Sequence, residues 1–168
     1  MKNIILTGFM GTGKTVVAKE LARLLGMKVV DVDTEIEKYK QMSINEIFKQ
    51  FGEPKFREIE TEIIKQVSEN NNVIISMGGG AVLKQENMDA VRKNGVIICL
   101  TATPETILER TSSNKDRPLL HVENPLERIK ELLQLRTPFY EKADIMIDTE
   151  KKSPIYIAEE IIERMKGY

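Results

Sequence analysis

The sequence predicts an α/β protein with a parallel sheet covered by helices on both faces. Short runs of β-branched and aliphatic residues alternate with longer stretches of helical period. The short runs are apolar throughout, which is typical of strands buried on both faces. A length of 168 residues and a hydrophobic content of 41% fit one compact domain with a core of its own. We therefore expect a single domain over residues 1–168.

The apolar runs predict five strands separated by helices, an arrangement that forms a parallel sheet. The predicted strands are Ile4–Thr7, Val29–Val32, Val73–Ser76, Val96–Leu100 and Ile145–Ile147.

Helix starts carry capping signals. Ser43-Ile-Asn-Glu46 has the form of a capping box, and a proline follows a capping residue at Asn124-Pro125 and at Ser153-Pro154, where an amphipathic helix runs through Met165. Further helices fit Thr15–Leu25, Pro54–Glu69 and Lys84–Lys93. The polar stretch at residues 112–123 fits no element, and we expect it to be a mobile lid.

Composition excludes several classes of protein. The formal net charge of −1 shows no basic excess, so we expect no nucleic-acid partner. The lone cysteine, Cys99, excludes an intrachain disulfide. The apolar run at the N-terminus is too short for a signal peptide or a membrane span. We expect a cytoplasmic protein with no membrane association, and a monomer because no long apolar stripe is left over after the core.

The strongest motif follows the first strand. Gly8-Phe-Met-Gly-Thr-Gly-Lys-Thr15 matches the phosphate-loop pattern G-x-x-x-x-G-K-[ST] between a predicted strand and a predicted helix. Its glycines let backbone N–H groups converge on a phosphate. Lys14 would reach the β- and γ-phosphate oxygens, and Thr15 would offer its hydroxyl to Mg²⁺.

Residues near the ends of the other predicted strands indicate which nucleotide is bound and which residue holds the metal. Asn114-Lys115-Asp116-Arg117 lacks the fourth-place aspartate of a guanine-recognition motif, so guanine specificity is not expected. No carboxylate ends the third strand, and Asp31 at the end of the second is placed to hold the metal.

An acceptor pocket is expected beside the phosphate loop, since ligands bind beyond the carboxyl ends of parallel strands. Asp31-Val-Asp33 is predicted to be extended, which would let one carboxylate serve the metal and the other accept a proton from a hydroxyl. The run Gly78–Gly80 would let main-chain amides approach a ligand closely. Arg57 and Arg136 are candidates for binding an anionic substrate.

At this point the chain resembles the shikimate kinase family of phosphate-loop kinases. Besides the phosphate loop, the matching segments cover nearly the whole chain in family order. They are Asp31–Glu37, Ser43–Phe48, Gly52–Glu60, Gly78–Gly80, Arg117–Leu120 and Arg136–Asp144. The D-x-D, G-E-x-x-F-R-x-x-E, triple-glycine and R-P-L-L patterns are far more specific to this family than the phosphate loop is.

The resemblance implies a three-layer fold with strand order 2-3-1-4-5, a substrate-binding region at about residues 32–60 and a lid. It also implies ATP-dependent phosphorylation of the 3-hydroxyl of shikimate, with Mg²⁺ as cofactor, in the shikimate pathway of aromatic amino-acid biosynthesis. Its implied catalytic residues are Asp33, Lys14 and Arg117. The implied substrate-binding residues are Asp33, Arg57, Gly78, Gly79, Gly80 and Arg136. The implied ATP-binding residues are Gly11, Thr12, Gly13, Lys14, Thr15, Val16, Arg110 and Arg117, with Thr15 and Asp31 on the metal.

Two other functions are compatible with the phosphate loop when the residues are considered alone. Another small-molecule kinase of similar size, such as a gluconate kinase, would share the phosphate loop but have a neutral or differently charged acceptor pocket, and Arg57 and Arg136 are the residues that discriminate between the two. A non-catalytic ATP-binding module would not need Lys14, Asp31, Asp33 and Arg117 together.

Overall fold

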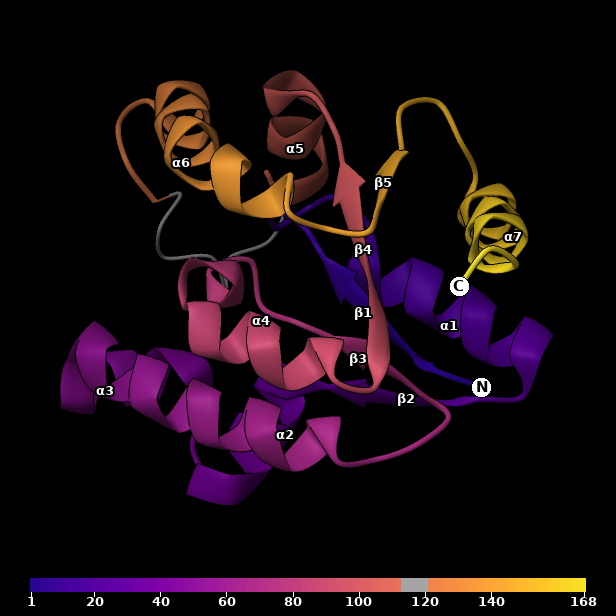
Figure 1. Cartoon of the computed structure of the whole chain (residues 1–168). Helices are drawn as coiled ribbons and strands as arrows, with labels where there is room; N and C mark the ends of the chain where they lie inside the picture. Colours follow the sequence, from indigo (N-terminus) through magenta and orange to yellow (C-terminus); the bar gives the residue numbers. More distant parts are fainter. Residues whose placement is uncertain (113–120) are drawn as a thin grey trace.

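The computed structural model describes residues 1–112 and 121–168, and these form an α/β fold in three layers (Figure 1). The strands are β1 (Asn3–Thr7), β2 (Lys28–Asp31), β3 (Val73–Ser76), β4 (Gly95–Thr101) and β5 (Ile145–Asp148). The helices are α1 (Lys14–Leu25), α2 (Val32–Lys40), α3 (Ile44–Ser68), the 3₁₀ turn η1 (Ala81–Leu83), α4 (Gln85–Arg92), α5 (Pro104–Thr111), α6 (Pro125–Tyr140) and α7 (Pro154–Met165).

The strands pair in parallel in the order β2-β3-β1-β4-β5, which confirms the expected sheet. In the register of this sheet, Ser76 of β3 pairs with Leu6 of β1 on one side and with Asp31 of β2 on the other. The carboxyl ends of these three strands therefore meet at one edge. The phosphate loop, the start of α2 and the glycine run all leave the sheet there.

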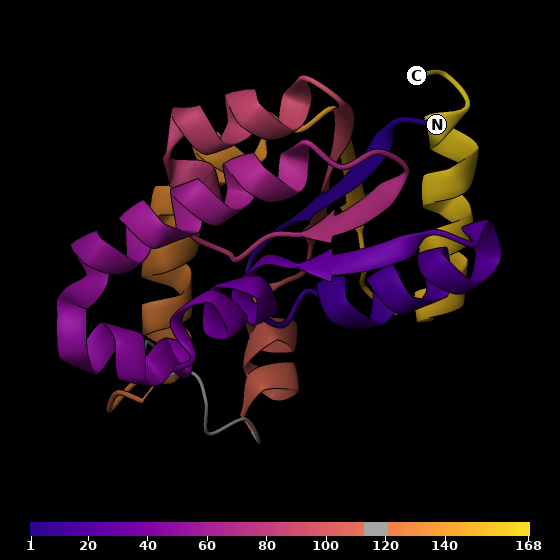
Figure 2. The same cartoon turned by 90° about the horizontal axis from the view of Figure 1, so that it is seen from below.

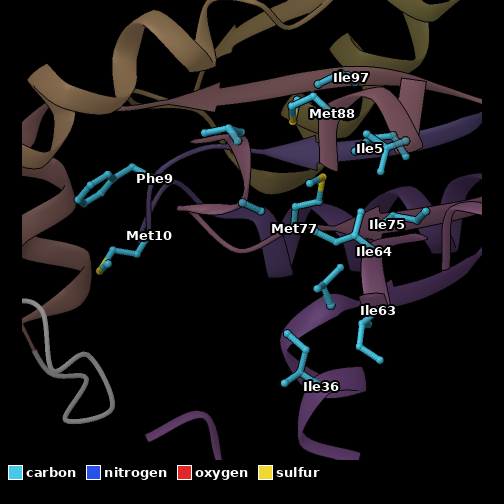
Figure 3. Close-up of a cluster of buried hydrophobic side chains, with 14 of the residues drawn as sticks. Ile5, Phe9, Met10, Ile36, Ile63, Ile64, Ile75, Met77, Met88 and Ile97 are labelled. Atoms are coloured by element: carbon cyan, nitrogen blue, oxygen red, sulfur yellow. The ribbon is translucent and has the colours of Figure 1, made fainter. Parts of the chain in front are cut away.

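The alternating side chains of the strands feed two hydrophobic clusters, one on each face. Ile4 and Leu6 of β1 belong to the cluster that α1 and α7 cover, and Ile5 belongs to the cluster on the opposite face. Figure 2 shows the sheet with α1 and α7 on one side and α3 and α4 on the other. Figure 3 shows part of the second cluster, where Ile64 of α3 and Met88 of α4 pack with Ile5. The sheet is thus fixed from both faces.

Helix α3 is longer than expected. The sequence predicts a capped start at Ser43 and a separate helix from Pro54, whereas the structure runs both together with a break at Gly52 (φ 80°, ψ 170°). Glycine adopts this conformation without steric cost, and Pro54 is tolerated because it falls in the first turn after the break. The break lets the second part of α3 carry Arg57 to the edge of the sheet.

Two short helices, α2 and α5, were not assigned from the sequence. The predicted strand Val29–Val32 is also wrong at its end, because β2 stops at Asp31 and Val32 opens α2. The lid prediction for residues 112–123 falls largely on residues 113–120, which lie outside the described residues. In the part of the chain that the structure describes, no helix is both long and apolar enough to cross a membrane.

The capping box at the start of α3 supports a stability prediction. The Ser43 hydroxyl accepts a hydrogen bond from the Glu46 N–H at 3.2 Å, and the Glu46 carboxylate accepts one from the Ser43 N–H at 2.8 Å. Ser43→Ala is expected to lower the free energy of unfolding by about 1 kcal/mol and the melting temperature by about 2–4 °C. Urea unfolding would measure the change.

Ser68→Ala is the matched control, because the Ser68 hydroxyl lies at the other end of α3 and caps no amide. Equal stability of Ser43→Ala and the wild type would show that the box does not hold the start of α3.

Candidate active site

The phosphate loop occupies the turn from β1 into α1. Gly8 has φ +133°, and a Cβ there would lie 2.4 Å from the Leu100 carbonyl oxygen, so only glycine fits. Lys14 Nζ donates to the carbonyl oxygens of Gly8 (2.7 Å) and Phe9 (3.0 Å). Helix α1 has no capping side chain and no acidic residue in its first turn. Its positive end is therefore suited to binding a phosphate.

A cavity of about 180 Å³ opens beside this loop and brings most of the predicted nucleotide and acceptor residues together. It lies where β1, β2 and β3 end. Its lining comprises Gly11, Gly13, Lys14, Thr15, Val16, Asp31, Asp33, Ser76, Met77, Gly78 and Gly79.

The two aspartates hold different positions on α2, and the predicted extended geometry of Asp31-Val-Asp33 is wrong. Asp31 is the N-cap of α2, with Oδ1 accepting hydrogen bonds from the Thr34 N–H (2.9 Å) and the Thr34 hydroxyl (3.0 Å). Asp33 lies in the first helical turn, with Oδ1 3.3 Å from the position of a Cβ on Gly78. An aspartate is a strong N-cap, and this preference ends the strand one residue early.

Arg57 lies against the glycine run. A Cβ on Gly80 would lie 2.4 Å from Arg57 Nη2, so the close approach of this guanidinium requires glycine. Arg57 Nη1 donates to Glu60 Oε1 at 2.8 Å, and Nη2 donates to Glu53 at 3.4 Å. These carboxylates hold the guanidinium in one orientation.

Glu60 is a further functional candidate, and it is the final glutamate of the G-E-x-x-F-R-x-x-E pattern, from which no role was predicted for it. Its side chain is 1% exposed, and its Oε2 has no hydrogen-bond partner among the described residues. Burial raises the pKa of Glu60, the ion pair with Arg57 opposes this, and the nearby charge of Asp33 raises the pKa further. The three-residue spacing from Arg57 was the available signal, since it places both side chains on one helical face.

Arg136 reaches the same run from α6. It is 5% exposed, its Cζ lies 5.5 Å from the centre of the Phe9 ring, and its Nη1 lies 3.4 Å from the position of a Cβ on Gly79. Two guanidinium groups from different helices therefore contact adjacent glycines. Phe9 adds a cation–π contact that the phosphate-loop pattern did not predict.

Arg110 links the phosphate loop to the segment after β5. Its Nη1 donates to the Gly11 carbonyl (3.3 Å) and the Thr149 hydroxyl (3.1 Å), and its Nη2 donates to the Thr149 carbonyl (3.4 Å). It thus lies next to the loop expected to bind ATP. Arg117, the expected lid residue, lies outside the described residues.

The burial of Glu60 predicts a pH dependence of stability. Because the folded-state pKa is raised above the ordinary value of 4.5, the folded protein holds the Glu60 proton more tightly than the unfolded chain does. This group's contribution is fully favourable below pH 4.5 and is lost as the pH rises through the folded-state pKa. Glu60→Gln removes this dependence. The free energy of unfolding of the variant, relative to wild type, is therefore expected to rise between about pH 4 and pH 7.

Urea unfolding at the two pH values would measure the difference. Glu62→Gln, on the exposed side of the same helix, is the control and should show none. A relative stability of Glu60→Gln that falls with pH would mean that the ion pair with Arg57 outweighs burial.

Comparisons with known proteins identify the family of the chain. The family model described as shikimate kinase matches residues 10–166. The chain is 56% identical over 163 residues to a shikimate kinase of Thermodesulfovibrio yellowstonii, covering 97% of this chain and 94% of the relative. A solved shikimate kinase from Acinetobacter baumannii in complex with shikimate superposes with a TM-score of 0.96 at 35% identity, covering 99% of this chain and 94% of the other. A structure from Aquifex aeolicus gives 0.86 at 38% identity, covering 98% and 96%. The chain therefore belongs to the shikimate kinase family.

Proposed function

We propose that the residues at this edge of the sheet transfer the γ-phosphate of ATP to the 3-hydroxyl of shikimate. Family membership makes the chain an ATP-dependent phosphotransferase of the shikimate pathway in aromatic amino-acid biosynthesis. The observation that carries the residue assignment is the position of two arginines against adjacent glycines. The glycine run also lies next to the carboxylate of Asp33, which lines the phosphate-loop cavity.

The acceptor is bound through its carboxylate in this proposal. Guanidinium groups form paired hydrogen bonds with carboxylates, and Arg57 and Arg136 reach the glycine run from different helices. Arg57 is already oriented by Glu60 and Arg136 by Phe9. The run Gly78–Gly80 presents backbone at the same place without side chains in the way. In this proposal, an acceptor whose carboxylate is bound by both arginines directs its 3-hydroxyl towards the phosphate loop.

Asp33 is the proposed general base. It lines the same cavity as Lys14, and its carboxylate is adjacent to Gly78. It takes the proton of the 3-hydroxyl as that oxygen forms a bond to the γ-phosphorus. The bond from the γ-phosphorus to the bridging oxygen of ATP breaks, and ADP leaves with the electron pair. Lys14 stabilises negative charge on the phosphoryl group as it is transferred, and the family resemblance implies the same role for Arg117.

The donor set beside the loop fits a magnesium ion. Thr15 and Asp31 line one cavity, and the described residues contain no group of three or more His, Cys, Asp or Glu side chains that could enclose a metal. Mg²⁺ suits such a site because it keeps several waters and takes phosphate oxygens with one or two protein ligands. The chemistry it supplies when bound is neutralisation of charge on the β- and γ-phosphates. A monomeric state and a cytoplasmic location stay predictions.

Release of ADP from Mg·ATP by the purified protein tests the proposal. Turnover should depend on shikimate and be absent with gluconate or with no acceptor. Equal turnover with gluconate would favour the alternative sugar-acid kinase. Release that is independent of any acceptor would mean that water is the phosphoryl acceptor.

Asp33→Asn is expected to lower kcat by at least about 100-fold, because a proton acceptor is lost from the reacting hydroxyl. Calorimetric binding of Mg·ATP should persist, since Asp33 is not assigned to the nucleotide. Asp89→Asn on the exposed side of α4 is the control. Full activity of Asp33→Asn would remove Asp33 from the mechanism.

Arg136→Lys keeps the positive charge but removes the planar fork. Its KM for shikimate is expected to rise about 10- to 100-fold, while its KM for ATP stays near the wild-type value. Arg128→Lys, on the exposed part of the same helix, controls for the substitution. A rise in the KM for ATP instead would place Arg136 on the nucleotide.

A further inference from the structure

We propose that Tyr140 is a positioning residue whose hydroxyl fixes the peptide unit between Gly79 and Gly80, so that the Gly80 N–H is directed at the acceptor. This inference deepens the proposed function and rests on it for the identity of the acceptor. The orientation of the peptide unit itself rests on a contact within the protein and can be tested without any acceptor.

The contact that carries the proposal joins two distant parts of the chain. The Tyr140 hydroxyl, at the end of α6, donates a hydrogen bond of 2.6 Å to the carbonyl oxygen of Gly79. Tyr140 is 4% exposed, so water does not compete readily for this bond. Tyr140 lies one helical turn after Arg136, and both side chains therefore reach the glycine run from the same side of α6. Helix α6 thus places a substrate-binding candidate, Arg136, beside a side chain, Tyr140, that donates a hydrogen bond to the backbone of the glycine run.

The hydroxyl remains a donor over the working pH range. Burial raises the pKa of Tyr140 to about 12, although the charge and hydrogen bonding of Arg136 act in the opposite direction. The proton is therefore present at neutral pH, and the bond to Gly79 does not depend on pH there.

The neighbouring carbonyl groups of the run are held differently. The Gly78 oxygen accepts from the Ala81 N–H at 3.1 Å, and the Gly80 oxygen accepts from the Leu83 N–H at 3.2 Å. Both are backbone bonds of the turn that leads through η1. Of the three carbonyl oxygens in the run Gly78–Gly80, only that of Gly79 accepts a hydrogen bond from a side chain of the described residues. A Gly-Gly peptide unit has little steric resistance to rotation, so this side chain decides its orientation.

The hydrogen bond to the Gly79 oxygen also fixes the direction of the N–H group in the same peptide unit. The C=O and N–H of a trans peptide unit point in opposite directions. Holding the Gly79 oxygen towards Tyr140 therefore directs the Gly80 N–H to the other side of the run. The hydrogen bonds of the described residues include none from the Gly80 N–H. In this proposal, a hydroxyl or carboxylate oxygen of the acceptor accepts a hydrogen bond from the Gly80 N–H.

Tyr140→Phe removes the hydroxyl and keeps the ring. Its KM for shikimate is expected to rise about tenfold, as for the loss of one well-placed hydrogen bond, with the KM for ATP unchanged within about twofold. Tyr156→Phe is the matched control, because Tyr156 is 56% exposed on α7. Circular dichroism checks that both variants are folded. An unchanged KM for shikimate, or an equal rise in both KM values, would overturn the proposal.

Glycine-selective ¹⁵N labelling provides a readout that needs no turnover. The chain has 10 glycines, so the amide spectrum is small enough to assign. Without acceptor, the Gly80 amide resonance of Tyr140→Phe should move relative to wild type, while that of Gly26, at the end of α1, should not. Added shikimate should shift the Gly80 resonance in the wild type and shift it less in the variant.

These two measurements separate the possible failures. A wild-type protein without shikimate-dependent turnover would contradict the proposed function, and the ligand-free spectrum would still decide whether Tyr140 sets the peptide unit. An identical Gly80 resonance in wild type and Tyr140→Phe would refute the role of Tyr140 even in an active shikimate kinase.

Discussion

The parallel pairing of β3 with both β1 and β2 is the constraint on which the candidate site depends. It aligns Ser76 with Leu6 and with Asp31, so three chain segments leave the sheet at neighbouring points. The phosphate loop, the N-terminus of α2 and the glycine run then share one cavity without any long connection. Hydrophobic clusters on both faces hold this register, since a slip of one residue would exchange the side chains between the faces.

The site also depends on close contact between guanidinium groups and the backbone of glycine residues. Arg57 and Arg136 approach glycines to distances that a side chain would block at Gly80 and crowd at Gly79. Two positive groups near one another are tolerable because Glu60 neutralises Arg57 and the face of Phe9 supports Arg136. Burial raises the pKa of Glu60 above its ordinary value, although Arg57 acts in the opposite direction, and Glu60 Oε2 has no hydrogen-bond partner among the described residues. These contacts within the protein orient both guanidinium groups, and such pre-organisation lowers the entropy lost on binding.

Much of this architecture could be predicted from the sequence, and the reasons differ between elements. The strands followed from apolar runs, and the phosphate loop followed from a motif whose spacing fixes its geometry. The strand order came from the family resemblance, because periodicity says nothing about which strands are neighbours. Helix α2 was missed, and Asp31-Val-Asp33 was wrongly predicted to be extended, because D-x-D is compatible with both an extended segment and a capped helix. The burial of Glu60 and the bond from Tyr140 to Gly79 could not be foreseen, because both depend on packing between segments distant in the chain.

Arg57 and Arg136 together select an acceptor by its carboxylate in the proposed function. Isothermal titration calorimetry of the wild-type protein with Mg·ADP would test it most directly, using shikimate and the analogue in which a carboxamide replaces the carboxylate. Charge-assisted hydrogen bonds to two guanidinium groups predict that the carboxamide binds at least about 100-fold more weakly. Equal affinity for the two compounds would show that Arg57 and Arg136 serve the fold instead of the acceptor.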